Sequence, residues 1–120
     1  GVTLFHINQV GGNDDLVFDG SSMIFGPDGS LRHYLPSFAS AFEIVNTDNI
    51  LPVALPEEDH AGDMLEALTL GVRDYLSKCG FKKAVIGLSG GIDSAVTAAI
   101  AVRALYRENS KLDRFSTSIL

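Results

Sequence analysis

The chain has 120 residues, 46% of them hydrophobic and 20% charged, with a formal net charge of −6. This composition is ordinary for a globular protein, and the negative charge argues against nucleic-acid binding, which depends on phosphate neutralisation by Lys and Arg. No apolar run approaches the roughly 20 residues of a membrane span. The single cysteine excludes an internal disulfide and favours a reducing, cytoplasmic setting. Because the sequence starts at Gly1 and not at a methionine, we expect a piece of a longer protein.

Residues 1–47 alternate short apolar runs with turn residues, which predicts a β-meander without a helix. Asp19-Gly20 is typical of a hairpin turn, Gly26-Pro27-Asp28-Gly29 of a second tight turn, and Gly11–Asp14 of a loop. We expect the first strand to be buried and the second and third to pair across Asp19-Gly20. The expected strands are residues 2–10, 16–18, 22–25, 31–35 and 41–45.

Residues 46–62 change in character, because they hold two prolines and three consecutive acids without sustained periodicity. They predict a linker and a domain boundary. Residues 63–78 then predict a helix that ends at Gly80, a residue suited to a left-handed C-cap. Its expected apolar face consists of Ala61, Met64, Leu65, Leu68, Val72, Tyr75, Leu76 and Cys79.

The next stretch predicts a short buried strand over Ala84–Leu88, a glycine-rich turn and a helix from Ser94 to about Tyr106. This helix is apolar almost all round, so we expect it to be buried on more than one side. A glycine loop that leads into a helix N-terminus favours an anion, because the first N–H groups of the helix lack partners and the helix dipole is positive there. Ser89 and Ser94 can add hydroxyl donors. Asp93 fits beside a phosphate mainly if a divalent cation lies between them.

Three other loops share some of these residues. A Walker A loop needs a lysine, and none lies between Lys83 and Lys111, while a dinucleotide fingerprint needs a glycine spacing that this loop lacks. Residues 87–91 do satisfy the Gly-x-Ser-x-Gly of a nucleophile elbow. That chemistry needs a histidine after the serine, whereas His6, His33 and His60 all precede Ser89. A plain turn between a core strand and a core helix is the remaining structural alternative.

Ser89-Gly90-Gly91-Ile92-Asp93-Ser94 resembles the pyrophosphate loop of the N-type ATP pyrophosphatases, and its context over residues 75–95 is similar to the NAD synthetases. Residues 8–22, Asn-Gln-Val-Gly-Gly-Asn-Asp-Asp-Leu-Val-Phe-Asp-Gly-Ser-Ser, are similar to the late part of the nitrilase-type glutaminase domain of glutamine-dependent NAD synthetases. Two stretches in the right order thus resemble one family.

The resemblance implies an α/β fold in three parts. Residues 1–50 would be the end of a nitrilase-like α-β-β-α sandwich, and residues 51–61 a linker. Residues 62–120 would hold the first helix, strand, loop and helix of a Rossmann-like adenine nucleotide alpha hydrolase domain, the ATP pyrophosphatase part of NAD synthetase.

The implied reaction is the ATP-dependent amidation of deamido-NAD, with ammonia from glutamine, through an adenylated intermediate and release of pyrophosphate. ATP and Mg²⁺ are the implied cofactors, and a homo-oligomer is the implied assembly, with no nucleic-acid or membrane partner. Asp93 would hold the metal, and the glutaminase Cys, Glu and Lys would lie upstream of residue 1. The implied ATP-binding residues are Gly87, Leu88, Ser89, Gly90, Gly91, Ile92, Asp93 and Ser94.

Several residues are set aside. Cys79 ends the predicted helix and is most simply a packed thiol, the histidines lack metal-ligand spacing, and Lys82 and Lys83 lie at the far end of the strand from the loop. Residues 108–111 predict a loop, and residues 114–120 depart from the family and carry no prediction. Two alternatives stay open: another pyrophosphate-loop amidotransferase or thiolase, and a non-catalytic fragment. We expect the 120 residues alone to be inactive and poorly folded, because the predicted strand has few partners to cover it.

Overall fold

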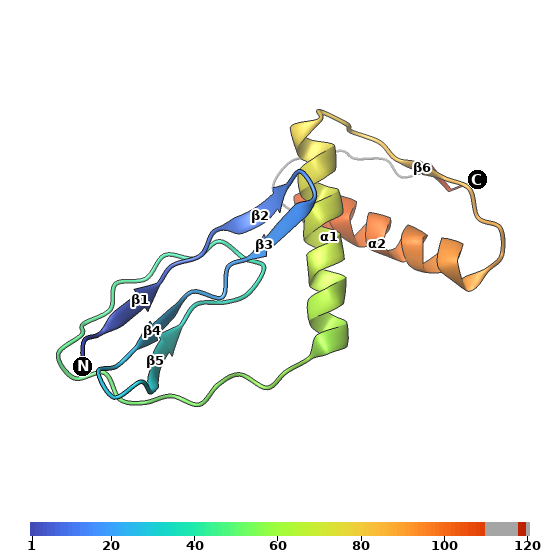
Figure 1. Ribbon diagram of the computed structural model, residues 1–120. Coiled ribbons are helices and arrows are strands. Elements are labelled where there is room, and N and C mark those ends of the chain that lie inside the picture. The colour runs from blue at the N-terminus through green and yellow to red at the C-terminus, as the bar shows by residue number, and fades with distance from the viewer. Residues whose placement is uncertain (110–117, 120) are drawn as a thin grey trace. The chain divides into compact units, whose positions relative to one another are not determined.

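The computed structural model describes residues 1–109, 118 and 119 (Figure 1). The chain divides into two units, the first made of residues 1–11 and 18–60 and the second of residues 12–17 and 61–120. The described elements are β1 (Leu4–His6), β2 (Val10–Asn13), β3 (Leu16–Asp19), β4 (Met23–Phe25), β5 (Leu31–Tyr34), α1 (His60–Lys78), β6 (Val85–Ile86), α2 (Ile92–Asn109) and β7 (Ser118–Ile119).

The first unit is built on an antiparallel sheet with the strand order β1-β4-β5. Leu4 faces Phe25 across the β1–β4 pair, and Met23 faces Tyr34 across the β4–β5 pair. Ile24 on β4 is the centre of this sheet and is buried, as is Leu31. The expected sheet without a helix in residues 1–47 is therefore confirmed in this part of the chain.

The first turn of this sheet was predicted at the wrong place. β3 pairs with β2 and not with β4, so the hairpin turns at Asp14-Asp15, where Asp14 has a φ of 52°. Aspartate tolerates this left-handed conformation better than most residues. The predicted loop at residues 11–14 is instead mostly strand β2. The turn at Asp14-Asp15 joins β2 to β3 and leaves β4 to pair with β1.

Asp19-Gly20 does not turn the chain because its hydrogen bonds hold it between two strands. The Asp19 carboxylate accepts hydrogen bonds from Asn8 Nδ2 at 2.9 Å and from Ser21 Oγ at 2.8 Å. The Gly20 N–H donates to the Gln9 carbonyl at 3.0 Å. These bonds join the residues between β1 and β2 to the end of β3 and to Gly20.

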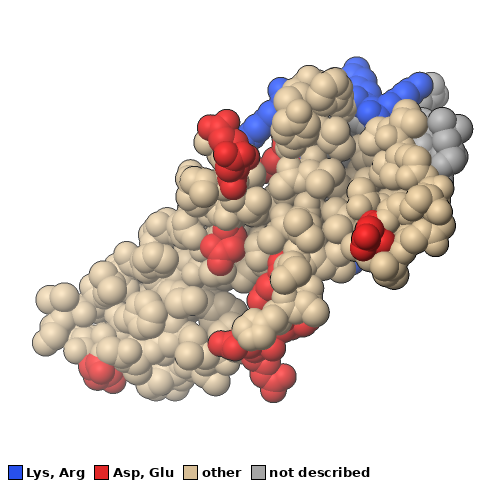
Figure 2. Space-filling view, turned by 45° about the vertical axis from the view of Figure 1, so that its right-hand side comes forward, with Lys and Arg blue, Asp and Glu red and all other residues tan. Residues whose placement is uncertain are grey.

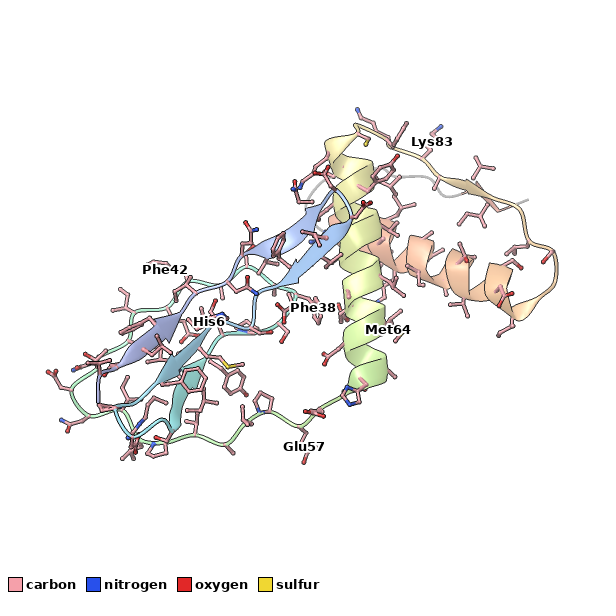
Figure 3. The ribbon with its side chains drawn as sticks, viewed as in Figure 1. His6, Phe38, Phe42, Glu57, Met64 and Lys83 are labelled. Atoms are coloured by element: carbon pink, nitrogen blue, oxygen red, sulfur yellow. The ribbon has the colours of Figure 1, made fainter. Side chains whose placement is uncertain are left out.

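Two further strand predictions for this unit were wrong. β1 is shorter than predicted and exposed, since Leu4 and Phe5 retain 56% and 51% of their accessible surface and, among the described strands, β1 pairs with β4 alone. Residues 41–45 form no strand, and Phe42 is 86% exposed (Figure 3). The segment is attached through a side chain, because His33 Nε2 lies 2.8 Å from Glu43 Oε2.

The second predicted turn is confirmed. The Gly29 N–H donates to the Gly26 carbonyl at 2.9 Å, and Gly29 has a φ of 80°. Asp28 Oδ1 accepts hydrogen bonds from the hydroxyl and the N–H of Ser30, at 2.7 and 3.1 Å, and Asp28 Oδ2 accepts one from Arg32 at 2.8 Å. These bonds, those of Ser30 first, lower the pKa of Asp28 from 3.8 to about 2.

We therefore expect the turn to lose its Asp28 contacts only in strong acid. A carboxyl whose pKa is lowered by folding stabilises the fold above its ordinary pKa, and that stabilisation disappears as the pH falls through the folded value, here between about 3.8 and about 2. Titration of the Asp28 carboxyl by NMR should show this low pKa, and Ser30→Ala should raise it. An unchanged pKa in Ser30→Ala would contradict the assignment.

Helix α1 begins three residues before its predicted start and ends as predicted. Gly80 has a φ of 72°, the Phe81 N–H donates to the Leu76 carbonyl at 2.8 Å, and the Gly80 N–H donates to the Ser77 carbonyl at 3.0 Å. This pair of bonds is the Schellman motif, which satisfies carbonyls that the helix cannot.

The predicted buried faces of both helices need correction. On α1, Thr69 and Leu70 are each 1% exposed, whereas Met64 and Tyr75, on the predicted apolar face, are 65% and 63% exposed. On α2 the buried residues are Ala98, Ala101, Ala104 and Leu105, while Val96 is half exposed. In the described part of the chain α1 covers one side of α2, where Arg103 donates a hydrogen bond to Glu66. Of the described residues of α2, Ile92 and Tyr106 are each 76% exposed.

Strand β6 is shorter than the predicted strand, and Val85 is 68% exposed where burial was predicted. β6 pairs in parallel with β7, which aligns Val85 with Ser118 and Ile86 with Ile119. β7 lies in the segment that carried no prediction. Of the predicted loop 108–111, the first two residues belong to α2 and the rest lie outside the described residues. Among the described helices, neither combines the length and the apolar character that a membrane crossing requires.

Candidate functional site

The loop between β6 and α2 is shaped by one left-handed residue. Gly90 has a φ of 84°, a conformation that costs an L-residue roughly 1–2 kcal/mol. The first hydrogen bond of α2 follows at once, from the Ala95 N–H to the Gly91 carbonyl at 3.2 Å. The chain therefore reverses at Gly90 and enters the helix within two residues, as the sequence predicts.

Two serines hold the loop closed on the helix. Ser94 Oγ donates to the Gly91 carbonyl at 2.9 Å and accepts a hydrogen bond from the Ser89 N–H at 3.3 Å. The two hydroxyl oxygens lie 3.2 Å apart, and Ser89 Oγ also accepts a hydrogen bond from the Gly91 N–H at 3.4 Å. The loop is thus ordered by its own side chains before any ligand arrives.

The open side of the loop exposes main chain. The first N–H groups of a helix have no acceptor within the helix, and a helix dipole adds partial positive charge at the same place. Residues 87–93 are exposed, and Ser94 is half buried. A Cβ placed on Gly87 or Gly90 would meet nothing within 4 Å, so there is space beside the loop for a group of phosphate size. The geometry can therefore bind an anion through main-chain donors.

Asp93 lies in the first turn of α2 and is exposed. Its main-chain carbonyl accepts a hydrogen bond from Thr97 Oγ1 at 2.8 Å, so this bond does not occupy the carboxylate. In the described part of the chain no three His, Cys, Asp or Glu residues gather as metal ligands. Mg²⁺ is commonly held by one or two carboxylates together with substrate phosphates, so Asp93 fits a cation that arrives with a phosphate ligand.

The remaining candidates stay outside this loop. Cys79 is an exposed free thiol just after α1, so its predicted packed position is wrong. Lys83 precedes β6 while the glycine loop follows it, as predicted (Figure 3). Within the described residues, Ser89 Oγ bonds to Ser94 and Gly91 and not to a histidine. On the face drawn in Figure 2 most of the surface is neither acidic nor basic, and the acidic side chains lie in separate places.

Fold and loop together define an α/β chain whose second unit presents a strand, a glycine loop and a helix N-terminus suited to phosphate. Residues 64–114 match the family model for NAD synthase. Over 90% of its length the chain is similar, at 46% identity, to the glutamine-dependent NAD(+) synthetase of Synechocystis sp.. It is 42% identical to that of Rhodobacter capsulatus over 91% of its length.

A solved structure supports the same comparison. The glutamine-dependent NAD+ synthetase of Acinetobacter baumannii, in complex with adenosine diphosphate, matches 98% of this chain with a TM-score of 0.79 at 33% sequence identity. The chain spans about a fifth of the length of its relatives, 20% of the Synechocystis protein and 22% of the Acinetobacter baumannii chain. The resemblance to the glutamine-dependent NAD synthetases is thereby confirmed, and so is the α/β fold class.

The two loop glycines allow a matched test of this geometry. Gly90→Ala should lower the free energy of unfolding by roughly 1–2 kcal/mol, because alanine is strained at a φ of 84°. Gly87→Ala is the control, since its Cβ enters open space without a positive φ, and it should change stability by less than about 0.5 kcal/mol. Chemical denaturation of both variants measures the difference. Equal effects would show that the left-handed turn is absent in solution.

Proposed function

We propose that the protein to which these residues belong amidates deamido-NAD to NAD, using ATP and ammonia released from glutamine. The observation that carries the proposal is the loop 87–94, which presents exposed main chain at the start of α2 inside the stretch that matches the NAD synthase family. The Acinetobacter baumannii relative was solved with a bound nucleotide, which supports nucleotide binding.

In the proposed complex the loop residues Gly87–Ser94 receive the phosphates of ATP. Main-chain N–H groups at the start of α2 donate to the phosphate oxygens, and Gly87 and Gly90 leave room for their approach. Negative charge grows on pyrophosphate as it leaves, so donors that are already in place lower the barrier. Ser89 and Ser94 supply this order through their bonds to the loop.

Asp93 is the proposed ligand for Mg²⁺. A bound Mg²⁺ would neutralise phosphate charge and orient the leaving group. The carboxylate of Asp93 stands where an anion would otherwise be repelled, which makes its presence consistent with a cation between the two. No further carboxylate is required from the described residues, since phosphate oxygens and waters complete the shell.

The proposed division of labour follows the predicted boundaries. Residues 1–50 would end the ammonia-producing domain and residues 62–120 would begin the ATP-using domain. Residues 51–61 would be the linker between the two domains. The Synechocystis relative matches 90% of the chain, so the matched part includes most of residues 1–50. This extent favours a glutamine-dependent NAD synthetase over other pyrophosphate-loop enzymes, which were expected to differ in the first segment. A cytoplasmic homo-oligomer stays a prediction.

Asp93→Asn in the complete enzyme tests the proposal. The variant should lose adenylation by roughly a hundredfold or more, because a removed charge-stabilising group typically costs that much in kcat. Glutaminase activity should be retained. Adenylation is followed with saturating ammonia, which removes any dependence on glutamine.

Asp63→Asn is the matched control. Asp63 is an exposed acid in the first turn of α1, so this change removes the same charge from the start of the other helix. It should leave adenylation unchanged. Wild-type activity of Asp93→Asn with saturating ammonia would contradict the proposed role of Asp93.

A further inference from the structure

We propose that residues 12–17, the tip of the β2–β3 hairpin, act as a clasp on helix α1. Side chains of α1 bind the main chain of this tip. The clasp is independent of the nucleotide loop and of the proposed function. Residues 12–17 lie in the second unit together with α1, although more than forty residues of the first unit separate them in sequence.

Helix α1 binds both polar groups of one glycine. The Gly12 N–H donates to Asp74 Oδ2 at 2.9 Å, and the Gly12 carbonyl accepts a hydrogen bond from Lys78 Nζ. Asp74 and Lys78 are four residues apart, so they lie on the same face of the helix. The Asp74 carboxylate accepts from the N–H and the Lys78 ammonium donates to the carbonyl of the same residue, so the pair binds main chain and not a particular side chain.

The contact also depends on two glycines. A Cβ placed on Gly12 would lie 3.3 Å from Gly71 Cα and 3.4 Å from Asp74 Cβ. A Cβ placed on Gly71 would lie 3.3 Å from Val17 Cγ2. The two distances of 3.3 Å are tighter than ordinary van der Waals contact, so the hairpin approaches the helix backbone as closely as it does because neither glycine has a side chain.

The carboxylate of Asp74 is itself held in position. Arg73 Nε donates to Asp74 Oδ1 at 3.1 Å while Oδ2 accepts from Gly12. The Asp74 side chain is 19% exposed. Hydrogen bonds to an ionised and partly buried acceptor are stronger than those between neutral groups. Asp74 is therefore the residue on which the clasp depends most.

The clasp fixes the helix that leads into the nucleotide loop. After α1 the chain turns at Gly80 and reaches β6 within a few residues. The second unit thus contains a segment from the far side of the predicted linker. A domain boundary at residues 51–61 would separate residues 12–17 from helix α1, with which they share the second unit.

Thiol cross-linking tests the clasp directly. In the complete enzyme, with Cys79 replaced by serine, Val17→Cys and Gly71→Cys introduce one thiol on each side of the contact between the hairpin tip and α1. A Cβ on residue 71 would lie 3.3 Å from Val17 Cγ2, which is one bond beyond the Cβ of residue 17, so the two Cβ atoms come within the range that a disulfide spans. Under mild oxidation we expect rapid cross-linking within the chain, seen as a mobility shift, and its loss in urea.

Val17→Cys with Met64→Cys is the matched control. Met64 lies about two turns, or roughly 10 Å, from Gly71 along α1, and is more exposed, so its thiol is reactive but out of reach. Adding Asp74→Ala to the Val17–Gly71 pair should slow cross-linking about tenfold or more, whereas Asp63→Ala should not. Equal rates for the two cysteine pairs, or no effect of Asp74→Ala, would overturn the proposal.

A second measurement covers the case in which the cysteine variant does not fold. Gly71→Ala improves helix propensity, yet it should lower the melting temperature because its Cβ meets Val17. Val17→Ala added to Gly71→Ala should recover the loss, and the coupling between the two changes reports the contact. Additive effects would overturn the clasp.

Discussion

The start of α2 presents N–H groups that have no acceptor within the helix, and the shape of the loop keeps these groups accessible. Gly90 turns the chain so that α2 begins immediately, and the Ser94 hydroxyl ties the helix back to Gly91. The donors therefore face outward in a fixed arrangement. A residue with a side chain at Gly90 would cost backbone strain, and the loss of Ser94 would free the loop.

The apolar surface of the second unit follows from how few elements surround the loop. Among the described strands β6 pairs with β7 alone, and Val85 remains exposed. On α2, Ile92 is 76% exposed while Ala104 is fully buried. Parallel strands are normally covered on both faces. The relatives, about five times as long as this chain, contain far more sequence that could supply such a cover.

Local sequence predicted the features that depend on single residues and missed those that depend on partners. The C-cap at Gly80, the turn at Gly26–Gly29 and the glycine-rich turn before α2 were predicted because each is marked by its own residues. The hairpin turn was misplaced because Asp19-Gly20 has the stronger local signal, while the pairing of β1 with β4 requires the turn at Asp14-Asp15. The contact between Gly12 and Asp74 has no local signal at all. The buried faces of the helices were predicted wrongly for the same reason, because the apolar face of a helix does not indicate which element packs on it.

The most direct test of the account follows the loop amides while a phosphate ligand binds. In the ¹⁵N-labelled complete enzyme titrated with ATP and Mg²⁺, the amide resonances of Gly90 to Ser94 should move first and furthest. The turn at Gly26–Gly29 belongs to the other unit and should stay unchanged as an internal reference. Saturable shifts confined to the start of α2 are the predicted result. Binding that leaves those amides unmoved, or that shifts only residues elsewhere, would contradict it.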